Sequence, residues 1–524
     1  MLRLTLALCC LTLAGCAPSP QFDNEVPGHL VVVYRNHQVP RNATQIAASS
    51  GAIVTTTLPQ LGLSTIATTP GNEDAVILSL EQNPEVETVL HDRYVTGHAL
   101  QILQQPQSSP PQLSVYAPPP IGGADPYPIL RGPIVAVQPP SSADSLYNSP
   151  QGWAVLQSGG FGSNIPNPST LESGPWNTSM GSGIRIAVVD SGIDATHPDL
   201  APNLVLNLSE INQDAQTGLP SACDTGSPQD QQGHGTFTAS LAAAAVGPAT
   251  GKLIGVAPQA SLLNIKVLER TAGAGETLQA QCEAGQATGL LSWVLQGIQD
   301  AQANHANVIS LSLGTLIDTA TGDGAGWKAQ FDRVTYAATQ SGSIIVAALG
   351  NDGLNLNGTL IELPAQARSV LAVTATTNPA CAEDLTPNAV CKPGPVSRPS
   401  YSNFGVANAI AAPGGSYPQG SLDTPSVASG FVTGACSSGL PNTTDGLPTT
   451  PNESFGCFNQ GHQQYVQAIG TSASAPLVAG AAALLQAAHL NWTATQIIAA
   501  LRSTATPSSA TNPQLNLLAA ITNP

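Results

Sequence analysis

The C-terminal part of the chain is predicted to form an α/β domain with a doubly wound, mostly parallel sheet and helices on both faces. Short apolar runs rich in β-branched residues alternate there with longer helical patterns, an order typical of βαβ units. The expected strands are residues 184–189, 261–267, 308–313, 344–348 and 370–375. The expected helices are residues 236–246, 285–304, 327–340 and 493–503.

A further helix is predicted after Ser472. Residues 477–485 are apolar on nearly all sides, which indicates a buried helix, and Pro476 suits the first turn, where no amide hydrogen is needed. Free amides at such a helix start, together with the helix dipole, favour negative charge beside Ser472. Taken alone, the same pattern also fits a serine that caps a core helix.

A smaller α+β unit is expected at residues 25–97. Apolar strands are predicted at residues 29–34, 52–57, 63–67 and 86–90, with a helix at 73–82, which together suggest a ferredoxin-like arrangement. Residues 98–143 are rich in proline and are predicted to be an extended linker. The larger α/β domain then covers residues 144–524.

The composition excludes some classes of partner. The net charge is -17 and no basic run exists, so nucleic acids and anionic membranes are not expected as electrostatic partners. The linker and the low charged fraction of 9% would also suit a binder of polysaccharides, but such a protein needs stacking aromatics, which are only 4% here.

The N-terminus has the form of an export signal. Met1-Leu2-Arg3 precedes an apolar run at residues 4–13, which is too short to span a bilayer. The run ends in Leu-Ala-Gly-Cys at residues 13–16, which resembles a bacterial lipobox, so Cys16 is expected to be acylated. An ordinary cleaved signal that contains cysteine is the alternative. Residues 1–16 therefore predict an extracytoplasmic protein of a bacterium, secreted or anchored to the membrane as a lipoprotein.

Six of the nine cysteines lie outside the signal, and an even number in an exported chain predicts disulfides: Cys223, Cys282, Cys381, Cys391, Cys436 and Cys457. Six cysteines allow 15 pairings. Cys381 with Cys391 and Cys436 with Cys457 would each close a short loop rich in turn residues, which leaves Cys223 for Cys282. No CxxC pair with matching histidines is present, so no metal site is expected.

Four polar residues share one kind of position in the α/β domain. Asp190 and Asn351 each follow an apolar strand, whereas His234, between two glycines, and Ser472 each stand at the start of a helix. Each alone fits a turn or a cap. Ligands bind at the carboxyl ends of parallel strands, however, so the four are expected to converge. The chain order Asp, His, Ser is that of subtilisin and differs from those of chymotrypsin and the α/β-hydrolases.

Five ordered motifs make residues 145–505 resemble the subtilisin family of serine endopeptidases. They are residues 187–194 around the aspartate, 233–236 around the histidine, 308–314, 350–351 and 470–472. The resemblance implies that Asp190, His234 and Ser472 form a catalytic triad and that Asn351 stabilises the oxyanion.

The same resemblance assigns the binding of an extended polypeptide substrate to Ser312, Leu313 and Gly314, and it implies a monomer that requires no cofactor. Residues 25–97 resemble, by pattern, the inhibitor-like propeptide of this family. We therefore expect a zymogen that is inhibited by its own propeptide. Processing in the linker would free it from a lipid on Cys16. A catalytically silent binding lipoprotein is the alternative, and the intact residues argue against it.

Departures from the family pattern occur near the expected cleft. Phe237, Ser240, Thr315 and Ser474 stand where other residues are usual, changes that could narrow the cleft without altering the chemistry. Asp199 matches a calcium ligand of the family, but the facing loop at residues 246–252 offers no acidic or amide side chain. A structural calcium ion is therefore doubtful.

Overall fold

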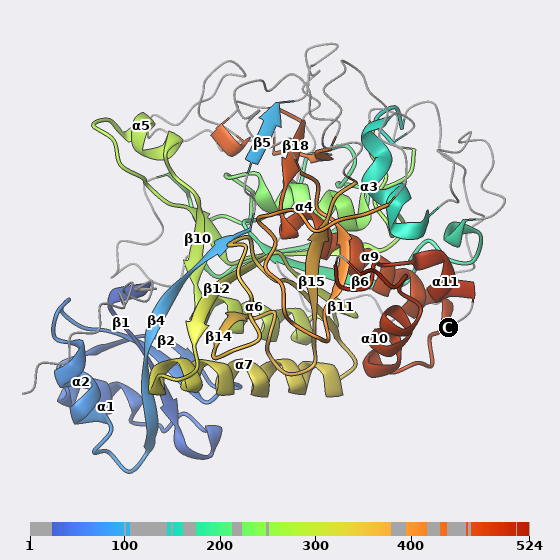
Figure 1. Cartoon of the computed structure of the whole chain (residues 1–524). Helices are drawn as coiled ribbons and strands as arrows, with labels where there is room; N and C mark the ends of the chain where they lie inside the picture. Colours follow the sequence, from blue (N-terminus) through green and yellow to red (C-terminus); the bar gives the residue numbers. More distant parts are fainter. Residues whose placement is uncertain are drawn as a thin grey trace, which may run out of the picture.

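The computed structural model describes most of the chain, and Figure 1 shows the path of the chain through it. The described residues are 24–98, 101–104, 144–147, 150–160, 174–211, 223–247, 251–378, 395–416, 430–437, 457–459, 463–509 and 511–522. The signal segment with Cys16, the cysteines Cys381 and Cys391, and most of the predicted linker lie outside them.

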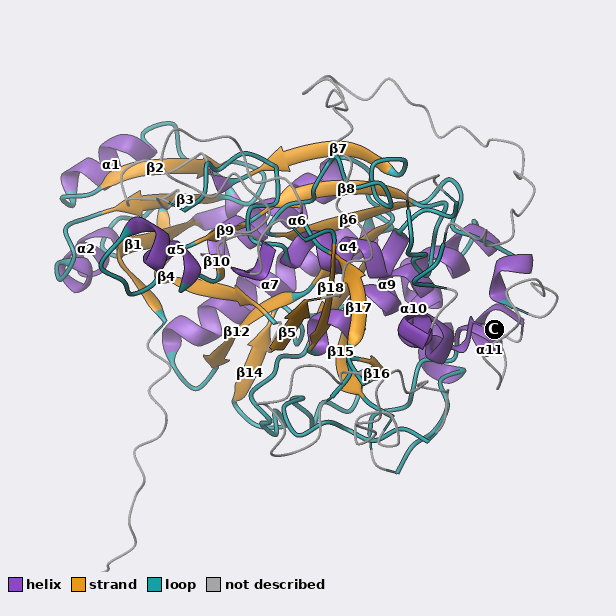
Figure 2. Ribbon diagram, turned by 90° about the horizontal axis from the view of Figure 1, so that it is seen from above, coloured by secondary structure: helices purple, strands orange, loops and turns teal. Residues whose placement is uncertain are grey.

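A seven-stranded sheet with the order β16-β15-β13-β11-β6-β8-β7 forms the centre of the main domain. All of its strand pairs are parallel, so the predicted doubly wound α/β fold is confirmed. The strands are β6 (Arg185–Asp190), β7 (Leu204–Ser209), β8 (Ser261–Lys266), β11 (Val308–Leu311), β13 (Ile344–Ala348), β15 (Val370–Thr376) and β16 (Ile410–Pro413). Figure 2 shows β7, β8 and β6 side by side along one edge. The edge strands β7 and β16 are absent from the sequence prediction.

Each face of this sheet has its own hydrophobic core, because side chains alternate along a strand. Ile186 and Val188 of β6 belong to one core, which also includes helices α4 (His234–Ala243), α9 (Thr471–Ala488), α10 (Ala494–Ser503) and α11 (Leu517–Thr522). Ala187 and Val189 belong to the other, with α6 (Leu291–Ala303) and α7 (Gly322–Gln340).

Helix α9 is the central helix of the first core. Its length and hydropathy would allow it to cross a membrane, but 89% of its 18 residues are buried inside the domain. It contains the buried helix predicted after Ser472 but begins earlier, at Thr471, so Pro476 lies inside the helix rather than in its first turn. Because its whole surface is packed, the residues at its start are held firmly against the sheet.

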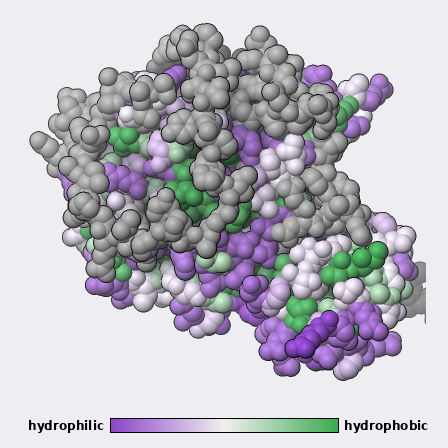
Figure 3. All heavy atoms as spheres, turned by 180° about the vertical axis from the view of Figure 1, so that it is seen from behind, coloured by the Kyte–Doolittle hydropathy of each residue, from purple (hydrophilic) through white to green (hydrophobic). Residues whose placement is uncertain are grey.

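The N-terminal unit, residues 24–98, is an antiparallel sheet in the order β4-β1-β3-β2 with two helices on one face (Figure 1). Its elements are β1 (Glu25–Tyr34), η1 (Arg35–His37), α1 (Ala43–Ser49), β2 (Ile53–Leu58), β3 (Leu63–Ala67), α2 (Glu73–Leu80) and β4 (Val86–Gly97). Figure 3 shows its outer end as mostly hydrophilic. Helix α1 is an addition to the elements expected from the sequence.

Strand β4 is 12 residues long and reaches out of this unit into the main domain. There it pairs with β10 (Ala287–Leu290) on one side and with β12 (Leu313–Asp318) on the other. Strand β10 continues to β9 (Leu268–Arg270), and β12 to β14 (Leu360–Leu363). The sheet of the N-terminal unit is thereby continuous with strands of the main domain.

Two predicted elements are each divided into two in the structure. Residues 285–304 were expected to be one helix, but residues 287–290 form β10, because backbone pairing with β9 and β4 outweighs local helix propensity there. The strand expected at 308–313 is divided at Ser312, where the chain leaves the central sheet and begins β12.

The main domain also contains a three-stranded sheet, in the order β17-β18-β5. It contains β5 (Gln101–Gln104), β17 (Val432–Ala435) and β18 (Tyr465–Ile469), and β5 falls within the predicted linker. The remaining short elements are η2 (Pro150–Gly152), α3 (Trp153–Val155), η3 (Leu156–Gly160), η4 (Pro175–Asn177), α5 (Leu278–Glu283) and η6 (Cys457–Asn459).

Candidate active site

Asp190 and His234 meet at the carboxyl end of the central sheet. Asp190 ends β6 and His234 begins α4, and both side chains are buried. His234 Nδ1 lies 2.7 Å from Asp190 Oδ1. The same carboxylate accepts hydrogen bonds from the Ser191 amide at 2.7 Å and from Thr238 Oγ1 at 3.2 Å. Three donors therefore fix the carboxylate, and the carboxylate in turn fixes the imidazole.

Ser472 is the second residue of α9 and is fully buried. Its backbone carbonyl accepts a hydrogen bond of 3.2 Å from Ser312 Oγ. Among the described residues, neither Ser472 Oγ nor His234 Nε2 has a hydrogen-bond partner. The hydroxyl and the second ring nitrogen are thus the two polar atoms that this arrangement leaves for chemistry.

Asn351 follows β13 and connects the site to α9. Its Oδ1 accepts hydrogen bonds from the Thr471 amide at 3.0 Å and from Thr471 Oγ1 at 2.9 Å. This contact turns the amide nitrogen in the opposite direction, where Nδ2 donates to the backbone carbonyl of His98. The side chain therefore holds a peptide carbonyl next to the start of α9.

The carbonyl belongs to a segment of the N-terminal unit that lies extended across the site. Thr96 is paired with Gly314 on β12 and with Thr288 on β10, and Gly97 is paired with Leu313. The His98 amide then donates to the Ser312 carbonyl at 3.1 Å. Ser312, Leu313 and Gly314 all contact this strand through their backbones.

Gly97 brings the extended segment close to the imidazole. A Cβ atom at this position would lie 3.1 Å from the His234 ring, so a larger residue would force the ring or the strand to move. Beyond His98, residues 101–104 pair with β18, the strand that leads into α9. The chain is therefore strand-paired on both sides of the bond that follows His98.

Comparison with known proteins identifies the family of this chain. The model of the subtilase family matches residues 181–518, which is more than half of the chain. The chain belongs to the subtilase family. It is 30% identical to subtilisin NAT of Bacillus subtilis subsp. natto over 62% of this chain and 61% of that protein. It is also 30% identical to subtilisin BL of Lederbergia lenta, over 63% of this chain and 87% of that protein.

Two solved structures share the fold of this subtilase. One is the epidermin leader peptide processing serine protease EpiP of Staphylococcus aureus, with a TM-score of 0.59 and 18% identity over 95% of this chain and 98% of that one. The other is fervidolysin of Fervidobacterium pennivorans, described as a keratinolytic enzyme related to subtilisin, with a TM-score of 0.57 and 18% identity over 95% of this chain and 61% of that one.

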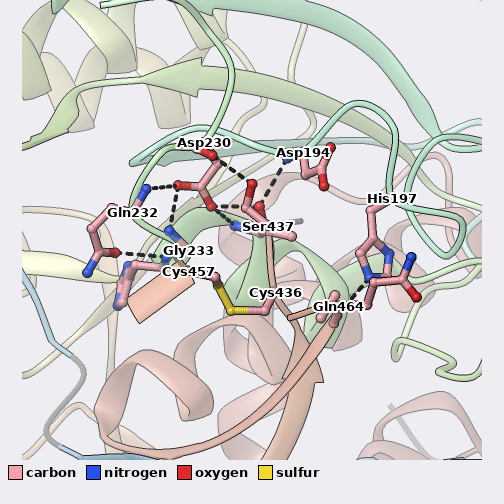
Figure 4. Close-up of a disulfide and its surroundings, with 12 residues drawn as sticks. Asp194, His197, Asp230, Gln232, Gly233, Cys436, Ser437, Cys457 and Gln464 are labelled. Carbon is pink, nitrogen blue, oxygen red and sulfur yellow. Dashed lines mark hydrogen bonds between the residues drawn. A yellow bond between two sulfur atoms is a disulfide. The ribbon is translucent and has the colours of Figure 1, made fainter. Parts of the chain in front are cut away.

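A disulfide of this subtilase lies next to Gly233, the residue before His234, as Figure 4 shows. Cys436 and Cys457 are bonded, with 6.0 Å between their Cα atoms, and Cys457 Sγ packs against Gly233. Phe458, the next residue, packs edge to face against the His234 ring, with 6.3 Å between the ring centroids. The Phe458 amide donates a hydrogen bond of 2.7 Å to the Gln232 carbonyl.

A second disulfide joins Cys223 to Cys282, with Cα atoms 5.3 Å apart, and its sulfurs are buried. Arg270 donates to the Cys282 carbonyl at 3.0 Å and to the Gln231 carbonyl at 3.0 Å. Through Arg270, this disulfide therefore supports the loop before α4 less directly than the disulfide beside Gly233 does.

Asp230 is a buried residue of the site that sequence reasoning missed. Its Oδ1 accepts from the Gly233 amide at 2.8 Å, and its Oδ2 accepts from the Thr236 amide at 3.0 Å (Figure 4). These bonds hold the residues on both sides of His234. The capping rule gives no signal for Asp230, because the N-cap position of α4 is occupied by Gly233.

Glu362 of β14 is the other missed residue. It is 1% exposed, and its Oε1 lies 3.1 Å from His98 Nε2. Burial raises the pKa of Glu362 to about 6, while His98 acts in the opposite direction. The only sequence signal is a lone acid within the apolar run 360–363.

The described residues around Asp199 do not fit a calcium ion. Its Oδ1 accepts from the amides of Lys252 at 2.8 Å and Leu253 at 3.3 Å, and its Oδ2 accepts from the Tyr465 hydroxyl at 2.8 Å. Calcium needs six to eight oxygen ligands, whereas N–H and O–H donors of the chain take up this carboxylate.

Proposed function

We propose that this subtilase is an exported serine endopeptidase that hydrolyses polypeptides through Asp190, His234 and Ser472. The family supports peptide hydrolysis as the reaction. The observation that carries the proposal for this chain is the position of the His98 carbonyl. A peptide group lies beside the triad, with its oxygen on Asn351 and its strand paired as a substrate would be.

The reaction follows from these positions. Ser472 Oγ attacks the carbonyl carbon of the scissile bond while His234 Nε2 takes the hydroxyl proton, and Asp190 stabilises the resulting imidazolium. Asn351 Nδ2 and the Ser472 amide bind the oxyanion. The imidazolium then gives its proton to the leaving amine, which breaks the C–N bond and leaves an acyl-enzyme. Water, deprotonated by His234, releases the acid and restores Ser472.

We further propose that residues 25–97 act as an inhibitory propeptide, so the chain is made as a zymogen. Strand β4 occupies the positions that a substrate strand would need between β10 and β12. Strand addition of this kind provides affinity through main-chain hydrogen bonds.

The N-terminal unit is also attached at the starts of two helices. Asp92 accepts hydrogen bonds from the amide and hydroxyl of Ser292 on α6. The Arg93 guanidinium contacts Asp323 on α7 at 2.7 and 3.0 Å. Trp327 Nε1 donates to the His91 carbonyl at 2.8 Å. These contacts orient β4 toward the site.

Labelling of the purified protein with a fluorophosphonate tests the proposed chemistry. We expect mass spectrometry to find the label on Ser472, and no label in Ser472→Ala. Ser474→Ala is the matched control, since this serine is buried nearby but donates to the Ala412 carbonyl, and it should still be labelled. A folded, processed sample without label on Ser472 would refute the endopeptidase.

For residues 1–16 we propose export and acylation at Cys16, so that processing in the linker releases the catalytic domain from the membrane. Incorporation of an alkyne fatty acid into the full chain should be lost in Cys16→Ala and retained in Cys9→Ala. A mature domain that is cleaved yet still held in the membrane through Cys16 would contradict release. The complete set of Asp190, His234, Asn351 and Ser472 leaves a silent binding protein without a supporting observation.

A further inference from the structure

Glu362 is a buried carboxylate that lies against a histidine of the N-terminal unit. Among the described residues, its two oxygens have no hydrogen-bond partner, and its ion-pair contact is with His98 Nε2 at 3.1 Å. A buried carboxylate without a partner is costly, so a domain that keeps one is expected to gain from pairing it with a cation.

The backbone of His98 places this contact at a defined point of the reaction. Its carbonyl is held by Asn351, and its amide is bonded to the Ser312 carbonyl. His98 is therefore the residue that provides the acyl group when the next bond is cut. The side chain of His98, rather than that of Thr96, is the one that reaches Glu362.

Two glycines provide the space around this contact. A Cβ atom on Gly314 would lie 2.7 Å from His98 Nε2, and one on Gly350 would lie 3.1 Å from Glu362 Oε2. Gly350 also has φ of +95°, which disfavours any other residue. The absence of side chains at these two glycines thus leaves the Glu362 carboxylate open to contact with the side chain of a bound strand.

The other titratable group that acts on Glu362 is an acid, so it cannot provide the positive charge that a histidine can. The titratable groups that act on it are His98, which lowers its pKa, and Asp352, which raises it. Asp352 Oδ2 accepts a hydrogen bond of 3.0 Å from Asn403 Nδ2. A second negative group in the vicinity increases the preference for a positive side chain.

We propose that Glu362 makes this subtilase select a cationic side chain, that of arginine, lysine or protonated histidine, in the residue before the scissile bond. The same contact defines the bond after His98 as the one cut when the N-terminal unit is removed. This inference rests on the proposed endopeptidase. Arginine fits best, because its guanidinium can donate two hydrogen bonds to one carboxylate.

Peptides that differ only in that residue test the selection. They carry Val-Thr-Gly-Xaa, as in residues 95–98, before a chromogenic amine, with arginine, histidine, glutamine or phenylalanine as Xaa. In the native enzyme we expect kcat/KM for arginine to exceed that for glutamine by roughly 10- to 100-fold, the range of a hydrogen bond to a charged group. In Glu362→Gln, which keeps the side-chain volume, the ratio should fall to about threefold or less.

Processing of the full chain provides a second measurement that does not depend on the folding of Glu362→Gln. The released N-terminal fragment should end at His98. We expect His98→Gln to slow its release by roughly tenfold or more, and His98→Arg to restore or exceed the native rate.

The outcomes separate this inference from the function on which it rests. Label on Ser472 with equal turnover of arginine and glutamine peptides, or native processing of His98→Gln, would overturn the selection and leave the endopeptidase in place. No label and no turnover of any peptide would overturn the endopeptidase itself.

Discussion

Two buried carboxylates of this molecule each face a histidine, and they differ in the part of the chain that provides this histidine. Asp190 contacts His234 of its own domain and receives two further hydrogen bonds, from Ser191 and Thr238. Glu362 contacts His98 of the N-terminal unit and has no hydrogen-bond partner among the described residues. The first pair is permanent and suits a role in every turnover. The second can exchange its partner, which suits the selection of a substrate.

The largest expected effect breaks the permanent pair. Asp190→Asn should lower kcat by about 10⁴-fold, because the amide no longer holds the proton on His234 Nδ1 or stabilises the imidazolium. KM should change little, since the Asp190 carboxylate bonds to His234, Ser191 and Thr238 and not to the strand-binding residues. Steady-state kinetics on the arginine peptide measure both, and a loss of kcat below tenfold would show that Asp190 does not act through His234.

Asn351→Ala should have the next largest effect, a fall in kcat of roughly 100- to 1000-fold through loss of an oxyanion donor. Asn351→Asp is the matched variant, because it retains an acceptor for Thr471 but cannot donate. Equal losses in both variants are expected. Retained activity in Asn351→Asp would mean that the residue acts by positioning Thr471.

Gly314→Ala should alter the exchangeable pair without touching the triad. The added methyl group would meet both Glu362 and the side chain before the scissile bond, and overpacking of this kind would lower kcat/KM for the arginine peptide by roughly tenfold or more. A peptide with glycine at that position should lose less of its kcat/KM, because it has no side chain for the methyl group to meet. An equal loss for both peptides would show that the added methyl group does not act through the side chain before the scissile bond.

The smallest effect is a pH dependence limited to cationic substrates. The pKa of Glu362 is about 6, because burial raises it while His98 acts in the opposite direction. The carboxylate gains a proton as pH falls through that value, and kcat/KM for arginine relative to phenylalanine should fall up to about tenfold per pH unit. The ratio should be independent of pH in Glu362→Gln. A native ratio that is constant from pH 8 to 5 would exclude ionised Glu362 as the selecting group.

The residues of the proposed triad were predictable because their signals are local. Asp190 ends an apolar strand, His234 lies between two glycines, and Ser472 precedes an apolar helix, so each could be placed at an element end without knowledge of the fold. Asn351 carries the same kind of signal. Their chain order and the family resemblance then supplied what the separate motifs could not.

Glu362 and its partner carry no comparable signal. The contact joins residues 98 and 362 and depends on strand β4 continuing to Gly97, whereas the apolar pattern of that strand ends near Leu90. Strand β10 was taken for part of a helix for the same reason, since its pairing partners are distant in sequence. Pairings of this range are decided by tertiary context rather than by local propensity.

Strand β5 has a consequence for the enzyme after cleavage. Because Gln101–Gln104 pair with β18, a cut after His98 would leave a new N-terminal segment still bound next to the nucleophile. A tethered segment of this kind has an effective concentration on the order of millimolar. Free peptides that extend past the scissile bond would have to displace it, so the enzyme's own terminus would act as a built-in competitor.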